Sequence, residues 1–194
     1  MNIITVPYNS DFHYIRPDIS LNRDSNDYFC PDDITEIAVV PFIYIRMERA
    51  GKAISAKFAN RYCSQIGYGV SLSAKSLIVE NCPVSFQTAN SLDNSTYISQ
   101  LFQPEHYPSE NILKGLEYME QNIAGFQLDD ENPWKDLLAS DAGKIMQFFY
   151  EKIEKITRYT SVRTGDFIAM ELHTPVIMPS EMAIKFGEIS FSIK

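Results

Sequence analysis

The sequence predicts an α+β domain that is mostly β, in which strands outnumber helices. Residues 36–48 give the strongest strand pattern, dense in β-branched and aromatic residues and apolar on both faces. Within residues 187–193, Ile, Phe and Ile alternate with Ser, as in a half-buried strand. Helical spacing of apolar residues marks two segments, 52–65 and 140–156, and strands separate them. This order is typical of an α+β fold and not of a doubly wound sheet.

The first 35 residues are turn-rich, and one short strand is expected at residues 12–15. That strand should end before Pro17, because a residue that precedes proline avoids the helical conformation. The long strand at residues 36–48 contains Pro41, which has no backbone N–H to donate to a neighbouring strand. We therefore expect Pro41 at a sheet edge or at a bulge.

The middle of the chain carries weaker patterns. A helix is expected at residues 52–65, where apolar residues recur at spacings of three and four. A short strand should follow at residues 68–72. Residues 84–86 and 97–102 are expected to form short strand or helix segments within a polar, irregular stretch.

The last third of the chain returns to regular patterns. Residues 113–119 and 123–128 are expected to pair as a hairpin. A second helix should begin at Ser140 or Asp141, either of which can cap its first turn. Another strand is expected at residues 167–172.

The charge of the chain limits its partners. Seventeen Lys and Arg stand against 25 Asp and Glu, for a net charge of −8. Binding to nucleic acid or to an anionic membrane requires clustered Lys and Arg, so we expect neither partner. The sequence has no apolar run of about 18 residues and no signal-peptide pattern. Three cysteines without a Cys-x-x-Cys pair favour a reducing compartment, and we expect a cytoplasmic protein.

Several segments, taken in order, resemble the fumarylacetoacetate hydrolase-like family. They are residues 14–21 (Tyr-Ile-Arg-Pro-Asp-Ile-Ser-Leu), 28–31 (Tyr-Phe-Cys-Pro), 49–52 (Arg-Ala-Gly-Lys), 66–75 (Ile-Gly-Tyr-Gly-Val-Ser-Leu-Ser-Ala-Lys) and 162–166 (Val-Arg-Thr-Gly-Asp). The resemblance implies a mixed β-sheet roll like the C-terminal domain of that family, with two main helices. It also implies one domain over residues 1–194, of which residues 1–35 are a shortened N-terminal segment.

The resemblance implies where a metal site would lie. Members of the family bind Mg²⁺ or a similar ion through two Glu of one strand and an Asp of the next, and act on 2-oxo acids and acylpyruvates with the help of a lysine. A Glu-x-Glu pair projects both carboxylates to one face of a strand, where a hard cation can bind their oxygens. In this chain the two glutamate positions fall on Val40 and Phe42, the aspartate on Ser71 and the lysine on Asn90.

These replacements predict that the metal site has been lost. Hydrocarbon side chains cannot coordinate a hard cation, and a lone serine hydroxyl is a poor ligand. The resemblance still implies a pocket at the equivalent positions, and we expect that pocket to be lined by Val40, Phe42, Ser71, Lys75, Asn90 and Thr174.

Three polar residues remain as candidates for catalysis. Glu171 and His173 are two residues apart in a predicted strand, where they would share a face and suit acid–base chemistry or a small metal site. Asp93 matches a position that the family commonly retains. A structural role is the competing interpretation of each residue.

Two hypotheses of function follow. The first is a non-catalytic relative of the hydrolases, without a cofactor, that has lost its divalent-metal site and acts as a binding or structural subunit. The alternative is a metal-dependent hydrolase, isomerase or decarboxylase of 2-oxo acids or acylpyruvates with a relocated site, which would use Mg²⁺ or Mn²⁺. Because relatives usually dimerise, we expect a homodimer or a heteromer with a paralogue. A small-molecule ligand is a further candidate partner.

Overall fold

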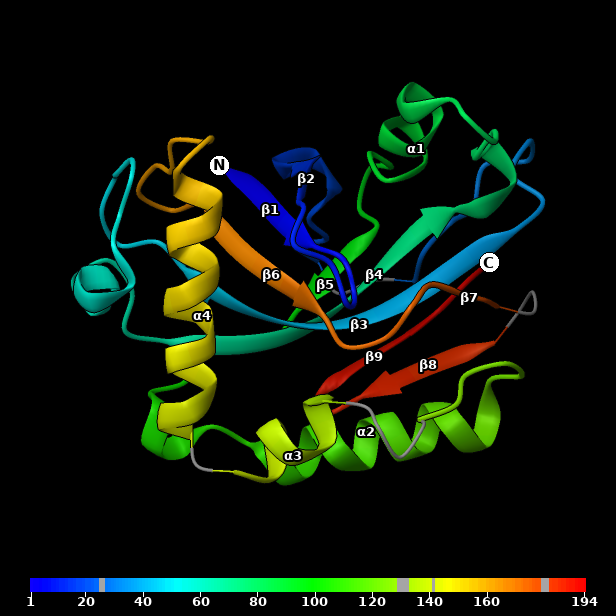
Figure 1. Cartoon of the computed structure of the whole chain (residues 1–194). Coiled ribbons are helices and arrows are strands. Elements are labelled where there is room, and N and C mark those ends of the chain that lie inside the picture. The colour runs from blue at the N-terminus through cyan, green and yellow to red at the C-terminus, as the bar shows by residue number, and fades with distance from the viewer. Residues whose placement is uncertain (25–26, 129–132, 141, 179–181) are drawn as a thin grey trace.

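The computed structural model of the chain describes residues 1–24, 27–128, 133–140, 142–178 and 182–194. A curled sheet forms its centre, and helices lie at one side of it, below it and above it (Figure 1). The strands are β1 (Asn2–Val6), β2 (Tyr14–Pro17), β3 (Ile37–Arg46), β4 (Ile66–Ala74), β5 (Thr96–Ile98), β6 (Phe167–Glu171), β7 (Val176–Ile177), β8 (Ala183–Phe186) and β9 (Ile189–Ser192). The α-helices are α1 (Pro83–Ala89), α2 (Ser109–Asn122), α3 (Pro133–Ala139) and α4 (Ala142–Thr157).

The main sheet is mixed and has the strand order β2-β1-β6-β3-β4-β5, with β7 also paired to β3. β1 and β6 run parallel, and the other pairs in this sheet are antiparallel. β8 and β9 form a separate antiparallel hairpin. The predicted α+β, mostly β roll is therefore confirmed, and so are the strands expected at residues 36–48 and 167–172 and the helix that becomes α4. Asp141, one of its two predicted caps, lies outside the described residues.

The sheet curls until its two ends meet. The backbone N–H of Asn94 donates to the carbonyl of Ile19, and the N–H of Asn22 donates to the carbonyl of Thr96. These bonds join the segment after β2, one edge strand, to the segment that enters β5, the other edge strand. The sheet thus encloses an interior of its own on one face.

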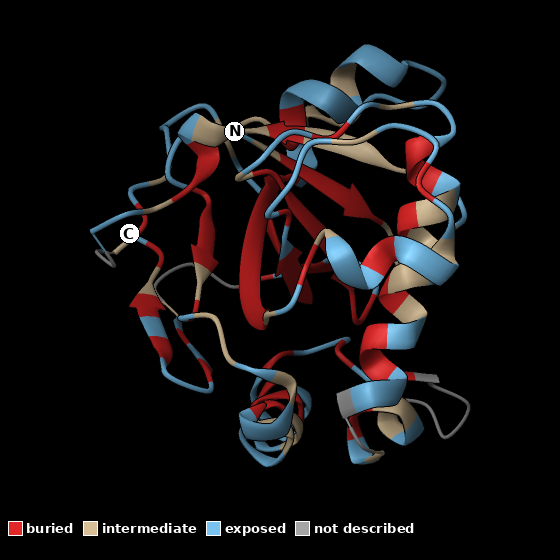
Figure 2. Cartoon of the chain, turned by 90° about the vertical axis from the view of Figure 1, so that its left-hand side faces the viewer, coloured by how far each residue is buried: buried red, intermediate tan, exposed pale blue. Residues whose placement is uncertain are grey.

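The other face of the sheet carries the larger apolar core. Side chains of β3, β4 and β6 pack there against α2, α4 and the β8–β9 hairpin. Figure 2 shows the buried residues gathered on the central strands, whereas the helices alternate buried and exposed turns. The Phe186 ring of β8 packs edge-on against Tyr68, and a side chain at Gly115 of α2 would overlap that ring. The smaller core inside the roll includes Phe42 and Tyr44.

Two expected elements are wrong. Residues 52–65 do not form a long helix; they contain one short 3-10 segment, Ala56–Arg61. Ala53 adopts a positive φ of 50°, and the N–H groups of Ala53, Ile54 and Ala56 donate to Thr157 and Glu154 of α4 instead of to a helix of their own. The segment is therefore held by α4.

The hairpin expected at residues 113–128 is also wrong, because its first half belongs to α2. Ile112, Leu116, Met119 and Ile123 are buried at i, i+4, i+7 and i+11, which is helical spacing. Pro41 is not in an edge strand either. It lies where the neighbour of β3 changes from β6 to β7, and there residues 40–41 face the four looped residues 172–175, so an irregular, bulge-like pairing is the expectation that fits. The N–H of Leu172 donates to the Pro41 carbonyl at 2.9 Å, and the missing N–H of Pro41 removes only the return bond.

Candidate functional site

The positions implied by the family resemblance come together inside the roll. Val40 pairs with Ser71 across β3 and β4, and Phe42 pairs with Glu171 across β3 and β6. Paired residues share a face of a sheet, so these four side chains all face the roll interior. Val40, Phe42 and Ser71 are each 3% exposed or less. The region is therefore closed to water.

Aromatic rings fill the floor of this interior. Phe42 is paired with Gly69, and Tyr44 is paired with Gly67. A methyl group added to either glycine would overlap the ring of its partner, so each ring lies directly over glycine backbone. The Tyr44 hydroxyl donates to the carbonyl of Ser99 at 2.7 Å, which leaves no unpaired polar atom on that ring.

A buried arginine occupies the polar part of the interior. Arg16 extends from the edge strand β2 and is 1% exposed. Its guanidinium donates to Thr96 Oγ1 (3.1 Å), Asn90 Oδ1 (3.1 Å), Ser95 Oγ (2.8 Å) and the carbonyl of Leu72 (2.6 Å). Thr96 is the register partner of Ser71, and Asn90 is the position of the family's lysine. The guanidinium therefore lies beside two of the positions that the resemblance assigns to the implied site, those of the lysine (Asn90) and of the aspartate (Ser71).

The buried charge of Arg16 is stabilised mainly by hydrogen bonds to neutral oxygens. Among the described residues no carboxylate forms an ion pair with Arg16. Four charge-assisted hydrogen bonds from a rigid, planar donor can hold a guanidinium away from water. Glu171 is a more distant acidic group that feels the charge of Arg16.

Glu171 is held at the rim of the same interior. Its carboxylate accepts hydrogen bonds from the Tyr14 hydroxyl (2.8 Å) and from the backbone N–H of Tyr8 (3.3 Å). Burial raises the pKa of Glu171 to about 7, although both hydrogen bonds and the positive charge of Arg16 oppose that shift. Burial also raises the pKa of Tyr14 well above its usual range, so this hydroxyl stays a donor.

His173 does not form a hydrogen-bonded pair with Glu171. Its Nδ1 lies 2.7 Å from the carbonyl of Thr174, and its Nε2 lies 2.9 Å from the carbonyl of Gln127. Its ring stacks on Phe126, with 4.2 Å between the ring centres. Since a carbonyl can only accept, both ring nitrogens are directed at structural acceptors.

The remaining predicted residues lie at the surface. Lys75, Asp93 and Thr174 are exposed, unlike Val40, Phe42, Ser71 and Asn90. Arg16 and Tyr14 were not among the candidates. The sequence feature that could have indicated a role for Arg16 is its basic side chain between the aromatic and apolar residues 14–15 and Pro17.

The residues present do not fit a divalent metal. Among the described residues, no group of three or more His, Cys, Asp or Glu side chains could hold an ion. In the roll interior the positions of the ligands carry hydrocarbon at Val40 and Phe42, and the permanent positive charge of Arg16 is bonded to Thr96, the register partner of Ser71. A cation would meet electrostatic repulsion there in place of carboxylate ligands.

By sequence the chain matches no protein-family model and no curated protein. Solved structures match it along its whole length. One is a protein assigned to the fumarylacetoacetate hydrolase family from Yersinia pestis CO92, at 13% identity and a TM-score of 0.63, covering 100% of this chain and 92% of that one. The chain has the fumarylacetoacetate hydrolase fold.

Enzymes of two reaction types share this fold with the chain. Fumarylpyruvate hydrolase from Pseudomonas aeruginosa, in complex with Mn²⁺ and pyruvate, matches at 12% identity and a TM-score of 0.64, over 100% of this chain and 89% of the enzyme. The 5-carboxymethyl-2-hydroxymuconate delta-isomerase from Mycobacterium smegmatis matches at 12% identity and a TM-score of 0.61, over 99% and 78%. At these identities the likeness concerns the fold and not the reaction. Every helix in the described ranges is too short or too polar to cross a membrane.

Proposed function

We propose that this chain is a non-catalytic protein with the fumarylacetoacetate hydrolase fold, which has lost the divalent-metal site and acts as a binding or structural subunit. The observation that carries the proposal is the position of Arg16. Its guanidinium is hydrogen-bonded to Asn90, and to Thr96 beside Ser71, at the place where a metal site is implied.

The chemistry of the interior supports this proposal. In a metal-dependent relative, the ion would stabilise the charge of an enolate-like intermediate as a Lewis acid. Here the hydrogen bonds of Arg16 go to protein oxygens, and Phe42 and Tyr44 cover the neighbouring backbone. The arginine therefore has a structural task, and its donors are not directed at a substrate.

Isothermal titration with Mg²⁺ and with Mn²⁺ tests the proposal. We expect no binding at about micromolar affinity, and no turnover of an acylpyruvate and oxaloacetate panel above the background rate. The double variant Asp32→Asn, Asp33→Asn serves as the control, since these exposed carboxylates could collect ions at the surface. Micromolar binding that survives in this control, or turnover that depends on the ion, would contradict the proposal.

One observation favours the alternative enzyme. Glu171 has a pKa of about 7 and a hydrogen bond from Tyr14, which suits a general acid or base near neutral pH. If the panel reveals turnover, Glu171→Gln and His173→Ala should each abolish it. Rates unchanged in both variants would exclude a relocated site at these residues.

The partners and location of the protein also belong to the proposal. We infer a homodimer, or a heteromer with a paralogue, in the cytoplasm. All three cysteines are free thiols, which accords with a reducing compartment. Multi-angle light scattering of the purified chain tests the oligomer: a dimeric mass supports a homodimer, and a monomeric mass without a paralogue present would rule it out.

A further inference from the structure

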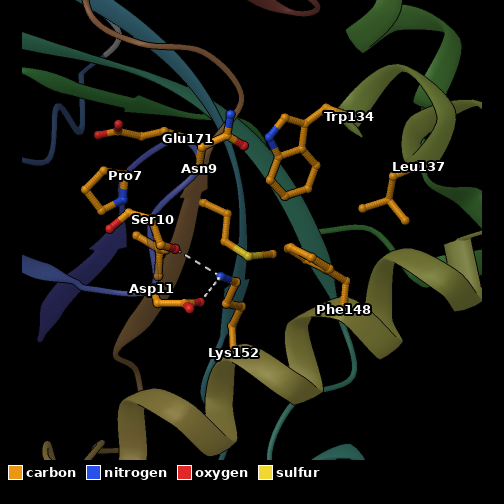
Figure 3. A pocket seen from close by; sticks show the side chains of 11 residues that line it. Pro7, Asn9, Ser10, Asp11, Trp134, Leu137, Phe148, Lys152 and Glu171 are labelled. Atoms are coloured by element: carbon orange, nitrogen blue, oxygen red, sulfur yellow. Dashed lines mark hydrogen bonds and ion pairs between the residues drawn. The ribbon is translucent and has the colours of Figure 1, made fainter. Parts of the chain in front are cut away.

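A second hollow lies on the other side of the sheet from the roll interior. Its cavity measures about 420 Å³ and is bounded by the loop after β1, the end of β6, α3 and α4 (Figure 3). Met170 and Glu171 both line this cavity, but the carboxylate of Glu171 points away from Trp134 and accepts hydrogen bonds from Tyr8 and Tyr14. Val40, Phe42, Ser71 and Asn90 are not among the residues that line it, so the cavity is distinct from the implied metal site.

Aromatic and aliphatic side chains make up most of the cavity wall. Trp134 of α3 and Phe148 of α4 meet edge to face, with 5.1 Å between their ring centres. Leu137, seen in Figure 3, continues this surface, and Met170 also lines the cavity. A cavity of this size with apolar walls and few polar groups is typical of a small-molecule site, and flat rings pack well against such walls.

One ammonium group, that of Lys152, lies at the polar end of the cavity, and its carboxylate partner Asp11 is shared with a second lysine. Lys152 Nζ donates to the carbonyl of Ser10 (3.0 Å) and to Asp11 Oδ1 (3.2 Å). The same carboxylate oxygen binds Lys155 at 2.7 Å, so two ammonium groups share one carboxylate. The Lys152 side chain is only 15% exposed and lies in the cavity wall.

Lys152 retains hydrogen-bonding capacity toward the cavity. An ammonium has three N–H donors, and the described residues accept from two of them. The carboxylate of Glu171 does not compete for the third, since in Figure 3 it points away from Trp134 and it accepts from Tyr8 and Tyr14. An anionic ligand group would therefore be received at this end.

We propose that this cavity binds a small carboxylic acid with a flat apolar body. The ring packs against Trp134 and Phe148, and the carboxylate accepts a charge-assisted hydrogen bond from Lys152. This inference is independent of whether the roll interior is catalytic, because the ligand would contact Trp134, Phe148 and Lys152, and none of these belongs to the implied site.

Trp134 is the single tryptophan of the chain, so its fluorescence reports on the cavity without a label. Phenylacetate is the probe, and phenylacetamide is its uncharged counterpart. We expect phenylacetate to change the Trp134 emission saturably. Lys152→Met should weaken phenylacetate binding about tenfold or more and leave phenylacetamide binding unchanged, because a charge-assisted hydrogen bond is lost.

Lys155→Met is the matched control. Lys155 binds the same Asp11 oxygen but does not line this cavity, so its loss should leave phenylacetate binding at the wild-type level. Lys152→Arg keeps the positive charge, so it should still bind phenylacetate more tightly than phenylacetamide. It is used in place of Lys152→Met if thermal melts show that Lys152→Met is unfolded. No saturable response to phenylacetate, or equal binding by wild type and Lys152→Met, would overturn the proposal.

Discussion

The two faces of β6 end in different environments. On one face, Glu171 borders an interior in which Arg16 meets four protein acceptors and aromatic rings cover the backbone. On the other face, Met170 borders a cavity of about 420 Å³ in which Lys152 meets two acceptors. Each region contains one buried basic side chain. The difference lies in whether open volume lies beside the charged group.

This comparison bears on how a binding site is recognised within an inherited fold. A buried charge alone does not mark a site, because Arg16 is buried and its hydrogen bonds serve the roll. A charged group with remaining donors beside an apolar hollow is a stronger indication. In this chain the second description fits Lys152, which lines a cavity that includes none of Val40, Phe42 and Ser71.

The largest expected effect comes from replacing the arginine of the closed region. Arg16→Met keeps an unbranched side chain but removes the guanidinium, so oxygens of Leu72, Asn90 and Ser95 lose their buried donor. We expect the free energy of unfolding to fall by about 4 kcal/mol, since each unsatisfied buried polar group costs about 1–3 kcal/mol. Urea denaturation at neutral pH measures this change.

Arg46→Met is the control for that experiment. Arg46 ends β3 in the same sheet and is exposed, so its replacement should change stability by no more than about 0.5 kcal/mol. If Arg16→Met unfolds at the wild-type urea concentration, the roll interior is not held by its arginine. The proposed difference between the roll interior, with its structural arginine, and the cavity beside Lys152 would then be wrong.

Much of the fold could be predicted from local patterns. The apolar run at residues 36–48 becomes β3, and the apolar spacing that continues to Ile156 becomes α4. Both patterns are long and are buried by the sheet or its main core. Residues 52–65 have a comparable pattern but no helix, because their backbone donors are taken by α4, which is about 100 residues away in the sequence.

The candidate site could be predicted only in part. Family resemblance brought Val40, Phe42 and Ser71 to one place, because strand register preserves their common face. Arg16 could not be assigned, since its partners are 56 to 80 residues away and become neighbours only when the sheet curls. The cavity was missed for a similar reason: Trp134 and Lys152 lie on separate helices, and the residues that complete its wall come from β6 and the first loop.

A smaller effect is expected at the rim of the roll interior. Burial raises the pKa of Glu171 to about 7, from an ordinary value near 4.5 that the unfolded chain retains. The folded state therefore binds the proton more tightly, and stability falls as the pH rises from about 4.5 to about 7. The difference of about 2.5 units sets an upper bound of about 3 kcal/mol on this loss. Glu171→Gln cannot ionise, so its stability should change less over this range.

Urea denaturation at pH 5, 6, 7 and 8 provides the measurement. Relative to wild type, Glu171→Gln should gain about 2 kcal/mol between pH 5 and pH 8, because only the wild type must ionise a buried carboxyl. Glu117→Gln, on the exposed side of α2, should keep the wild-type pH profile. If Glu171→Gln also keeps that profile, Glu171 is solvated. The rim of the roll interior would then be open to water. The roll interior and the Lys152 cavity would then differ less in their access to water than the buried side chains of Phe42 and Arg16 imply.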